Sequence, residues 1–230
     1  MRIIFTYLPI RLNEITEIYL KYSIEKLNKS GIVPIIYSDE DYFLSEGFKY
    51  DWVNFNVDEK YKKNNLWSYP KLKALSSVSF PFIHLDNDLI VDDFNKLKSL
   101  IDPEKLNLCY KHPLRKDQTR DFEELYKKYS NENIEFNELN NTSIIATKNY
   151  LEVNKTYQEV VDVIDLNYDF FTERYNGIPP ITLNQQHLNL RFKEINYLFK
   201  GNPSFREIDS NGVCHMDEKN IPNFLLKKLI

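Results

Sequence analysis

The sequence predicts a single α/β domain with a mainly parallel central sheet flanked by helices. An apolar strand, an amphipathic helix and a second apolar strand follow one another from Arg2 to Tyr37. Such a unit implies parallel strands joined by a right-handed crossover. Further apolar runs then alternate with helical periodicity, as in other α/β chains. With 230 residues, 42% of them hydrophobic, the chain suffices for one sizeable core.

The first unit carries its own boundary signals. Arg2 to Leu8 is a short apolar run rich in strand-forming residues. Gly31 is placed to end the helix that follows, and Ile32 to Tyr37 is the second strand. Pro34 indicates that this strand lies at an edge or begins there. The helix shows one apolar stripe, made of Leu12, Ile15, Tyr19, Tyr22 and Leu27.

The rest of the chain alternates in the same way, without a repeat or linker that would divide it. Pro70 is tolerated near the start of a helix, and Asp92 and Asp93 are suited to the cap and first turn of another. Apolar runs predict strands at 51–57, 80–85, 89–91, 106–110, 142–147, 195–199 and 212–215. Periodicity predicts helices at 66–79, 122–129, 150–174, 182–192 and 221–230.

Composition argues against several classes of partner and of protein. The formal net charge is −4, so no positive field attracts nucleic acid or an anionic membrane. No segment approaches the roughly 18 consecutive apolar residues of a transmembrane helix, and the N-terminus lacks signal-peptide features. We therefore expect a cytoplasmic protein. The two cysteines, Cys109 and Cys214, are too few for a disulfide framework and lack metal-binding spacing.

Two carboxylates, Asp86 and Asp88, stand between the apolar runs 80–85 and 89–91. Ligands of open α/β sheets bind at the carboxyl ends of strands, and residues two apart in extended chain point to the same side. Both carboxylates could then bind one Mg²⁺ or Mn²⁺, cations that prefer oxygen ligands and bridge to substrate phosphates. Asp-Asn-Asp is also a good turn tripeptide. The apolar flanks favour a metal, because buried carboxylates without a partner are costly.

The segment from Leu66 to Leu75, followed by His84-Leu85-Asp86-Asn87-Asp88, resembles nucleotide-sugar glycosyltransferases of the GT-A fold. The likeness is closest to glycosyltransferase family eight and its uncharacterised relatives. It implies a GT-A-like, Rossmann-like domain, with Asp86 and Asp88 as metal ligands and Asn87 beside the donor. Lys71 matches a basic position that faces the donor's phosphates or sugar.

Two later motifs extend the resemblance. Asn140-Asn141-Thr142-Ser143 resembles the family's Phe-Asn-x-Gly, which implies that Asn141 contacts donor or acceptor hydroxyls, with Ser143 in place of the glycine. Asn184-Gln185-Gln186-His187-Leu188-Asn189 resembles Asp-Gln-Asp-x-Leu-Asn, which lies near the reacting sugar carbon. Gln185 and Asn184 are therefore the candidate catalytic residues, although Asn184 replaces an aspartate.

The segment from Val213 to Lys219 resembles the late His-x-x-Gly-x-x-Lys element. By this likeness His215 is the third metal ligand and Lys219 reaches the diphosphate. Lys219 comes one residue early and the glycine is missing. His84 and His112 have no such context, and we interpret them as structural or surface histidines.

Together, the motifs imply transfer of a sugar from a nucleoside diphosphate, expected to be UDP, to an unknown glycan or lipid-linked saccharide. Configuration would be retained if the likeness to family eight holds. Thr6 and Tyr7 would face the uracil and ribose. Residues 1–110 would form the nucleotide-sugar half, and residues 111–230 the acceptor side with the late metal-ligand element. Acceptor contacts could also come from a partner protein or from peripheral association with a membrane, and bacterial surface-polysaccharide assembly fits by analogy.

Two other classes stay open. The departures at Ser143 and Asn184 are compatible with a catalytically silent domain that binds a sugar nucleotide or a glycan. A metal-dependent nucleotidyltransferase also uses Asp-x-Asp, but it needs a Gly-rich basic loop after the first strand. The stretch from Leu8 to Asn13 contains no glycine, which argues against that class.

Overall fold

The computed structural model describes a central sheet, the helices on both its faces and two small sheets. The described residues are 1–8, 14–43, 47–63, 69–87, 89–91, 93–108, 111–113, 138–140, 143–166, 205–207 and 214–216. The helices predicted at 122–129, 182–192 and 221–230 and the strand at 195–199 lie outside them. No helix of this described part is both long and apolar enough to cross a membrane.

Seven described strands form the central sheet, in the order β10-β6-β9-β4-β1-β2-β3. Only β9 runs antiparallel to its neighbours; the remaining pairs, β1–β4, β1–β2, β2–β3 and β6–β10, are parallel. The predicted α/β class with a mainly parallel sheet is therefore confirmed. The strands are β1 (Arg2–Thr6), β2 (Ile35–Ser38), β3 (Asp51–Asn54), β4 (Phe82–Leu85), β6 (Leu106–Leu108), β9 (Ile144–Thr147) and β10 (Phe205–Glu207).

The first unit folds as predicted. Helix α1 (Glu14–Lys29) follows β1 and ends before Gly31, whose φ of 72° is in the left-handed region that favours glycine. The Ile32 amide donates to the Leu27 carbonyl at 2.9 Å, which closes the helix end. Strand β2 begins just after Pro34, because a residue without an N–H is tolerated at a strand start.

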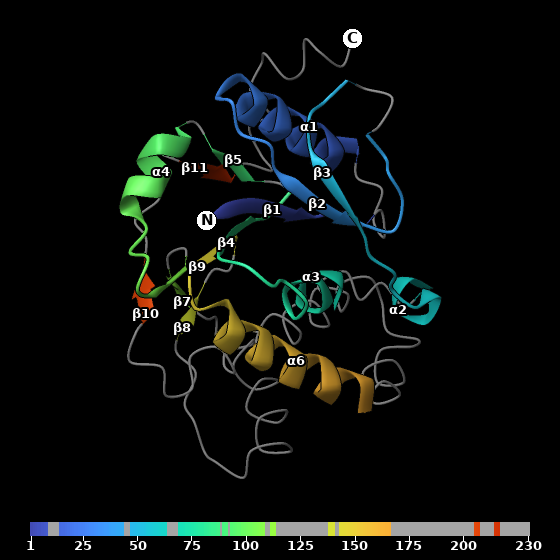
Figure 1. Cartoon of the computed structure of the whole chain (residues 1–230). Helices are drawn as coiled ribbons and strands as arrows, with labels where there is room; N and C mark the ends of the chain where they lie inside the picture. Colours follow the sequence, from blue (N-terminus) through green and yellow to red (C-terminus); the bar gives the residue numbers. More distant parts are fainter. Residues whose placement is uncertain are drawn as a thin grey trace.

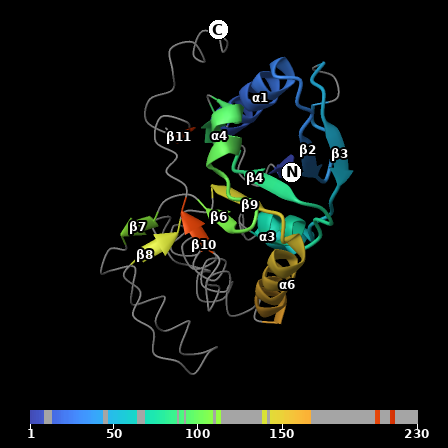
Figure 2. The ribbon, with the colours of Figure 1, turned by 60° about the vertical axis from the view of Figure 1, so that its left-hand side comes forward.

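Helices cover both faces of the sheet (Figure 1). Side chains alternate along each strand, so Ile3 and Phe5 pack on one face and Ile4 on the other. The first face is covered by α1 and by α4 (Phe94–Leu100). The second is covered by α3 (Tyr69–Leu75) and α6 (Tyr150–Leu166), with the short α2 (Glu59–Lys63) beside them. Figure 2 shows α6 beside α3 below β4 and β9.

Some elements differ from the sequence prediction. As predicted, Pro70 lies in the first turn of α3 and an aspartate caps α4: Asp93 accepts from the Asn95 and Lys96 amides. Helix α2 was not predicted, because five residues are too few for a periodic pattern. Neither were β10 and the small sheet that joins β7 (Lys111–Pro113) to β8 (Glu138–Asn140). Strand β5 (Leu89–Val91), predicted as the apolar run that follows β4, pairs with β11 (Cys214–Met216) in a second small sheet.

Candidate functional site

The candidate site lies at the carboxyl ends of β1 and β4. Strand β4 is central, and the chain leaves it at Asp86. The Asp86 amide still donates to the Ser143 carbonyl at 2.9 Å, and the Asp86 carbonyl accepts from the Leu89 amide at 3.1 Å. These bonds hold Asp86 between the end of the sheet and the turn into β5. Asp88 lies outside the described residues.

Lys71 and Asp86 form an ion pair across α3 and β4. The Lys71 Nζ is 2.8 Å from Asp86 Oδ1, and the two side chains are only 12% and 14% exposed. Solvent screens such a pair much less than a pair on the open surface. Helix α3 packs its apolar side on the sheet, and this brings Lys71 over the end of β4. The two residues singled out by the resemblance are thus in direct contact.

Asn87 joins the ends of β4 and β1. Its Nδ2 donates to the Thr6 carbonyl at 2.7 Å. Since a carbonyl only accepts, this contact fixes which end of the amide is the nitrogen and leaves Oδ1 as a separate acceptor. Asn87 Oδ1 and the hydroxyl of Thr6 are both buried and have no hydrogen-bond partner. Two polar atoms from neighbouring strand ends are therefore unsatisfied.

His84 adds two more unsatisfied atoms. The side chain is buried, and neither Nδ1 nor Nε2 has a hydrogen-bond partner. Burial, and next the Lys71 ammonium, lower the pKa of His84 to about 3, against an opposing effect of Asp86. The ring is therefore neutral at physiological pH. A buried polar group without a partner costs about 1–3 kcal/mol, so the fold tolerates a strained arrangement here.

The position of His84 was not recognised as functional from the sequence. Its Nδ1 is 4.0 Å from Asp86 Oδ1, which is beyond a hydrogen bond but in direct proximity. Residues two apart in a strand share a face, so Phe82, His84 and Asp86 follow one another on the α3 side of the sheet. A polar residue between an apolar one and Asp86 on the same face is the signal that could have identified it.

The β5–β11 pair brings the late part of the chain to this region. His215 is the backbone partner of Ile90, and Met216 that of Leu89. Strand β5 is in turn tied to α1, since the Ser23 hydroxyl donates to the Leu89 carbonyl at 3.2 Å. The backbone of His215 therefore lies beside the strand that directly follows Asp88. The side chain of His215 is outside the described part.

Apart from His215, the predicted site residues divide into three groups. Lys71, Asp86, Asn87 and Thr6 are brought together. Tyr7 packs in the core on the α1 side, where its ring meets Tyr42 and Phe43 and its hydroxyl donates to Glu17 at 3.3 Å. Among the described side chains, no three His, Cys, Asp or Glu residues gather as a metal site. The residues outside the described part are Asp88, Asn141, Asn184, Gln185 and Lys219.

No protein-family model and no curated protein matches the chain. Among solved structures, the chain is similar to the glycosyltransferase GlyE of Streptococcus pneumoniae TIGR4, with 13% identity, a TM-score of 0.45, and coverage of 91% of this chain and 45% of that one. It is similar to mouse xyloside xylosyltransferase 1, with 11% identity, a TM-score of 0.48, and coverage of 91% and 85%. The galactosyltransferase LgtC, solved with donor and acceptor sugar analogs, gives 15% identity, a TM-score of 0.49, and coverage of 91% and 74%.

These neighbours are of the class that the sequence motifs resemble, and they do not single out family eight. The chain spans less than half the length of GlyE. Since each of these TM-scores is below 0.5, we base the functional proposal on the residues of this chain.

Proposed function

We propose that the protein is a metal-dependent glycosyltransferase that moves a sugar from a nucleoside-diphosphate sugar, with UDP as the nucleotide, to a saccharide acceptor. The observation that supports this most directly is the cluster at the ends of β1 and β4. There the Asp86 carboxylate binds a cationic group, and His84 Nδ1, which is unsatisfied, lies 4.0 Å from Asp86 Oδ1. Asn87, next in sequence, and Thr6, whose carbonyl it binds, hold two more unsatisfied oxygen atoms. A fold tolerates such atoms where a ligand completes them.

The residues fit a divalent cation. The Lys71 ammonium, 2.8 Å from Asp86 Oδ1, shows that a positive charge is stabilised beside this carboxylate. We propose that Asp86, Asp88 and His215 bind Mn²⁺ or Mg²⁺, because both cations prefer carboxylate oxygen ligands such as those of the two aspartates. The backbone pairing of His215 with Ile90 supports its inclusion. When bound, the cation would neutralise the charge that develops on the departing diphosphate.

Lys71 has a second role in this proposal. A cation bound at Asp86 would compete with the Lys71 ammonium for the carboxylate, and Lys71 would then be available to the diphosphate of the donor. Charge-assisted hydrogen bonds to phosphate oxygens are among the stronger polar contacts in proteins. Lys219 would add to this positive environment, while Asn141, Asn184 and Gln185 would contact the transferred sugar or the acceptor. The division into a donor half, 1–110, and an acceptor half, 111–230, belongs to the same proposal.

Thr6 and Asn87 would contact the nucleoside. Asn87 Oδ1 accepts from an N–H or O–H group, and the Thr6 hydroxyl both donates and accepts. A nucleoside offers such groups on its base and ribose. Both protein oxygens are covered in the structure, so a ligand reaches them only after a neighbouring side chain moves.

A thermal-shift experiment tests the proposal. UDP-, GDP- and CMP-sugars are added with and without Mn²⁺ to the full chain and to two variants, Asp86→Asn and Lys71→Met. We expect a Mn²⁺-dependent rise in Tm with one UDP-sugar, its loss in Asp86→Asn, and a weaker rise in Lys71→Met. Lys148→Ala, on the exposed surface, is the control.

If none of the sugar nucleotides raises Tm in a Mn²⁺-dependent way, the proposed donor site is refuted. A rise without hydrolysis of the UDP-sugar, and without transfer to any saccharide, would favour a silent binding domain.

A further inference from the structure

His84 is the most unusual buried group in the described part of the chain. Strand pairing places it between Ile4 of β1 and Ile145 of β9, both core residues beneath α3 and α6. Leucine or phenylalanine would satisfy such a position without leaving polar atoms unpaired. His84 instead leaves Nδ1 and Nε2 without partners, directly below the Lys71–Asp86 ion pair.

The geometry relates His84 to one particular oxygen. Asp86 Oδ1 is 2.8 Å from Lys71 Nζ and 4.0 Å from His84 Nδ1. The ion pair therefore holds this oxygen toward α3. A movement of Oδ1 by about 1 Å toward the ring would bring it within hydrogen-bond distance. Binding of a divalent cation to Asp86 would displace Lys71 and so remove the interaction that holds the oxygen away.

We propose that His84 is a positioning residue that donates a ring N–H to the Asp86 carboxylate and orients it for the divalent cation. This inference rests on the proposed function, because it requires that Asp86 binds a metal. Carboxylates and imidazoles that bind metals are commonly held by a second layer of hydrogen bonds, and loss of such a partner typically weakens metal binding about 10–100-fold.

A ring N–H that has no other partner suits this role. A charged partner such as Lys71 competes with the metal for the same carboxylate, whereas a neutral N–H donor orients the carboxylate without opposing the cation's charge. Lys71 and His84 thus act on Asp86 in different ways, one as a displaceable cation and the other as a fixed donor.

Three variants separate this role from simple packing. His84→Phe keeps an aromatic ring but has no N–H, and His84→Asn retains an N–H donor near the position of Nδ1. Phe82→Leu is the matched control, since Phe82 is buried two residues earlier on the same face of β4. The affinity for Mn²⁺ alone is measured by the electron paramagnetic resonance signal of free Mn²⁺, and Tm is measured for each variant without metal.

We expect His84→Phe to bind Mn²⁺ at least about tenfold more weakly than the wild type, with an unchanged or higher Tm. His84→Asn should recover most of the affinity, even if its Tm falls, and Phe82→Leu should lower Tm without changing the affinity. Equal affinities in His84→Phe and the wild type would overturn the positioning role. Failure of the wild type to bind Mn²⁺ would instead contradict the metal site itself.

A second measurement reports on the hydrogen bond directly. The chain has four histidines, so ¹⁵N-histidine labelling gives a simple spectrum, which His84→Phe assigns. On addition of Mg²⁺ we expect one His84 N–H to become protected from solvent exchange and to shift downfield. If the His84 signals stay unchanged while Mg²⁺ binds, the proposed bond does not form.

Discussion

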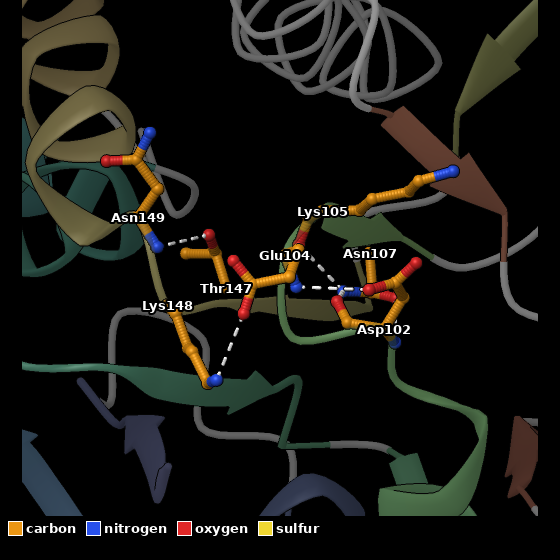
Figure 3. Close-up of polar contacts among 7 residues, drawn as sticks. All are labelled: Asp102, Glu104, Lys105, Asn107, Thr147, Lys148 and Asn149. Carbon is orange, nitrogen blue, oxygen red and sulfur yellow. Dashed lines mark hydrogen bonds and ion pairs between the residues drawn. The ribbon is translucent and has the colours of Figure 1, made fainter.

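Buried polar side chains near one end of the central sheet have hydrogen-bond partners, whereas those near the other end have unpaired atoms. Asn107 of β6, most of whose partners lie in the turn at the amino end of that strand, is fully buried, and all its polar atoms have partners (Figure 3). Its Oδ1 accepts from the Asp102 amide at 2.8 Å, and its Nδ2 lies 2.7 Å from the Asp102 carbonyl and 2.8 Å from that of Lys105. At the carboxyl end of β4, Asn87 has one bonded atom and one that is buried and unpaired.

The threonines repeat the contrast. Thr147, at the end of β9, is buried, and its hydroxyl accepts from the Asn149 amide at 3.0 Å. Thr6, at the end of β1, is also buried, and its hydroxyl has no partner. Strand pairing sets Thr147 opposite Phe82, at the start of β4, whereas Asp86 follows its end. The same residue types thus form hydrogen bonds within the fold at one end, while at the other they leave hydrogen-bonding capacity unused.

The largest expected effect is at Asp86. Asp86→Asn removes a negative charge from the proposed metal site, and metal ions contribute several kcal/mol of charge stabilisation. We expect the Mn²⁺-dependent binding of the nucleotide sugar, and any transfer, to fall by at least about 100-fold. Isothermal titration with UDP and Mn²⁺ measures the binding. A variant that binds the pair as tightly as the wild type would remove Asp86 from the metal site.

A smaller effect, on stability alone, is expected at Asn107. Asn107→Leu leaves the Asp102 amide and several carbonyls without a partner, which should lower the free energy of unfolding by about 2–4 kcal/mol. Asn87→Leu loses a single bond to the Thr6 carbonyl and should cost about 1 kcal/mol. Urea unfolding of both variants measures the difference.

Ligand binding is measured for the same two variants, Asn107→Leu and Asn87→Leu. We expect Asn107→Leu to bind UDP and Mn²⁺ as the wild type does, and Asn87→Leu to bind them more weakly. If Asn107→Leu weakens the binding of UDP and Mn²⁺ more than Asn87→Leu does, the contrast between the two asparagines is refuted.

The sequence predicted the features whose signals are local. Gly31 marks the end of α1, as its position in the sequence predicted. The apolar stripe of that helix was predicted only in part: Tyr19 and Leu27 are buried, but Leu20 and Ile24, which also pack in the core, were not in it. The antiparallel direction of β9 could not be predicted from the sequence, because a buried strand is an apolar run whether it pairs parallel or antiparallel. The resemblance assigned Lys71 and Asp86 to the same donor site but did not predict their ion pair. The residues alone do not reveal that α3 packs over the end of β4.

The unpaired state of His84 could not be predicted either. A histidine in an apolar strand gives no information on which neighbours in the fold offer hydrogen bonds. That depends on Ile4 and Ile145, which come from strands far apart in the sequence and offer none from their side chains. Such partners become visible only when the sheet is assembled.

A pH dependence of stability follows from His84. Its pKa of about 3 in the folded protein is below the unfolded value of 6.5, because burial and next the Lys71 ammonium disfavour the charged ring. The unfolded chain therefore binds a proton below pH 6.5 that the folded protein does not, and stability falls as the pH decreases toward 3. Between pH 6.5 and 5 this amounts to about 2 kcal/mol.

His84→Phe should not show this fall in stability at low pH, because phenylalanine does not titrate. Urea unfolding at pH 7.5 and pH 5.0 measures it: the advantage of the variant over the wild type should grow by about 2 kcal/mol at the lower pH. Phe82→Leu, which does not titrate, should show the same difference from the wild type at both pH values. A pH-independent difference for His84→Phe would mean that the folded ring accepts a proton as readily as an exposed one.

The smallest effect separates the two threonines. Thr→Val exchanges a hydroxyl for a methyl group of similar size, so the effect reports on the hydrogen bond. Thr147→Val removes the acceptor of the Asn149 amide and should lower the free energy of unfolding by about 1 kcal/mol.

Thr6→Val removes a hydroxyl that has no partner, so stability should be unchanged or slightly higher. Its binding of UDP with Mn²⁺ should weaken roughly 3- to 10-fold, the equivalent of one hydrogen bond. Differential scanning calorimetry and titration of both variants measure the two quantities. Equal losses of stability would show that the Thr6 hydroxyl has a partner in solution, and the contrast between the ends would then rest on His84 and Asn87.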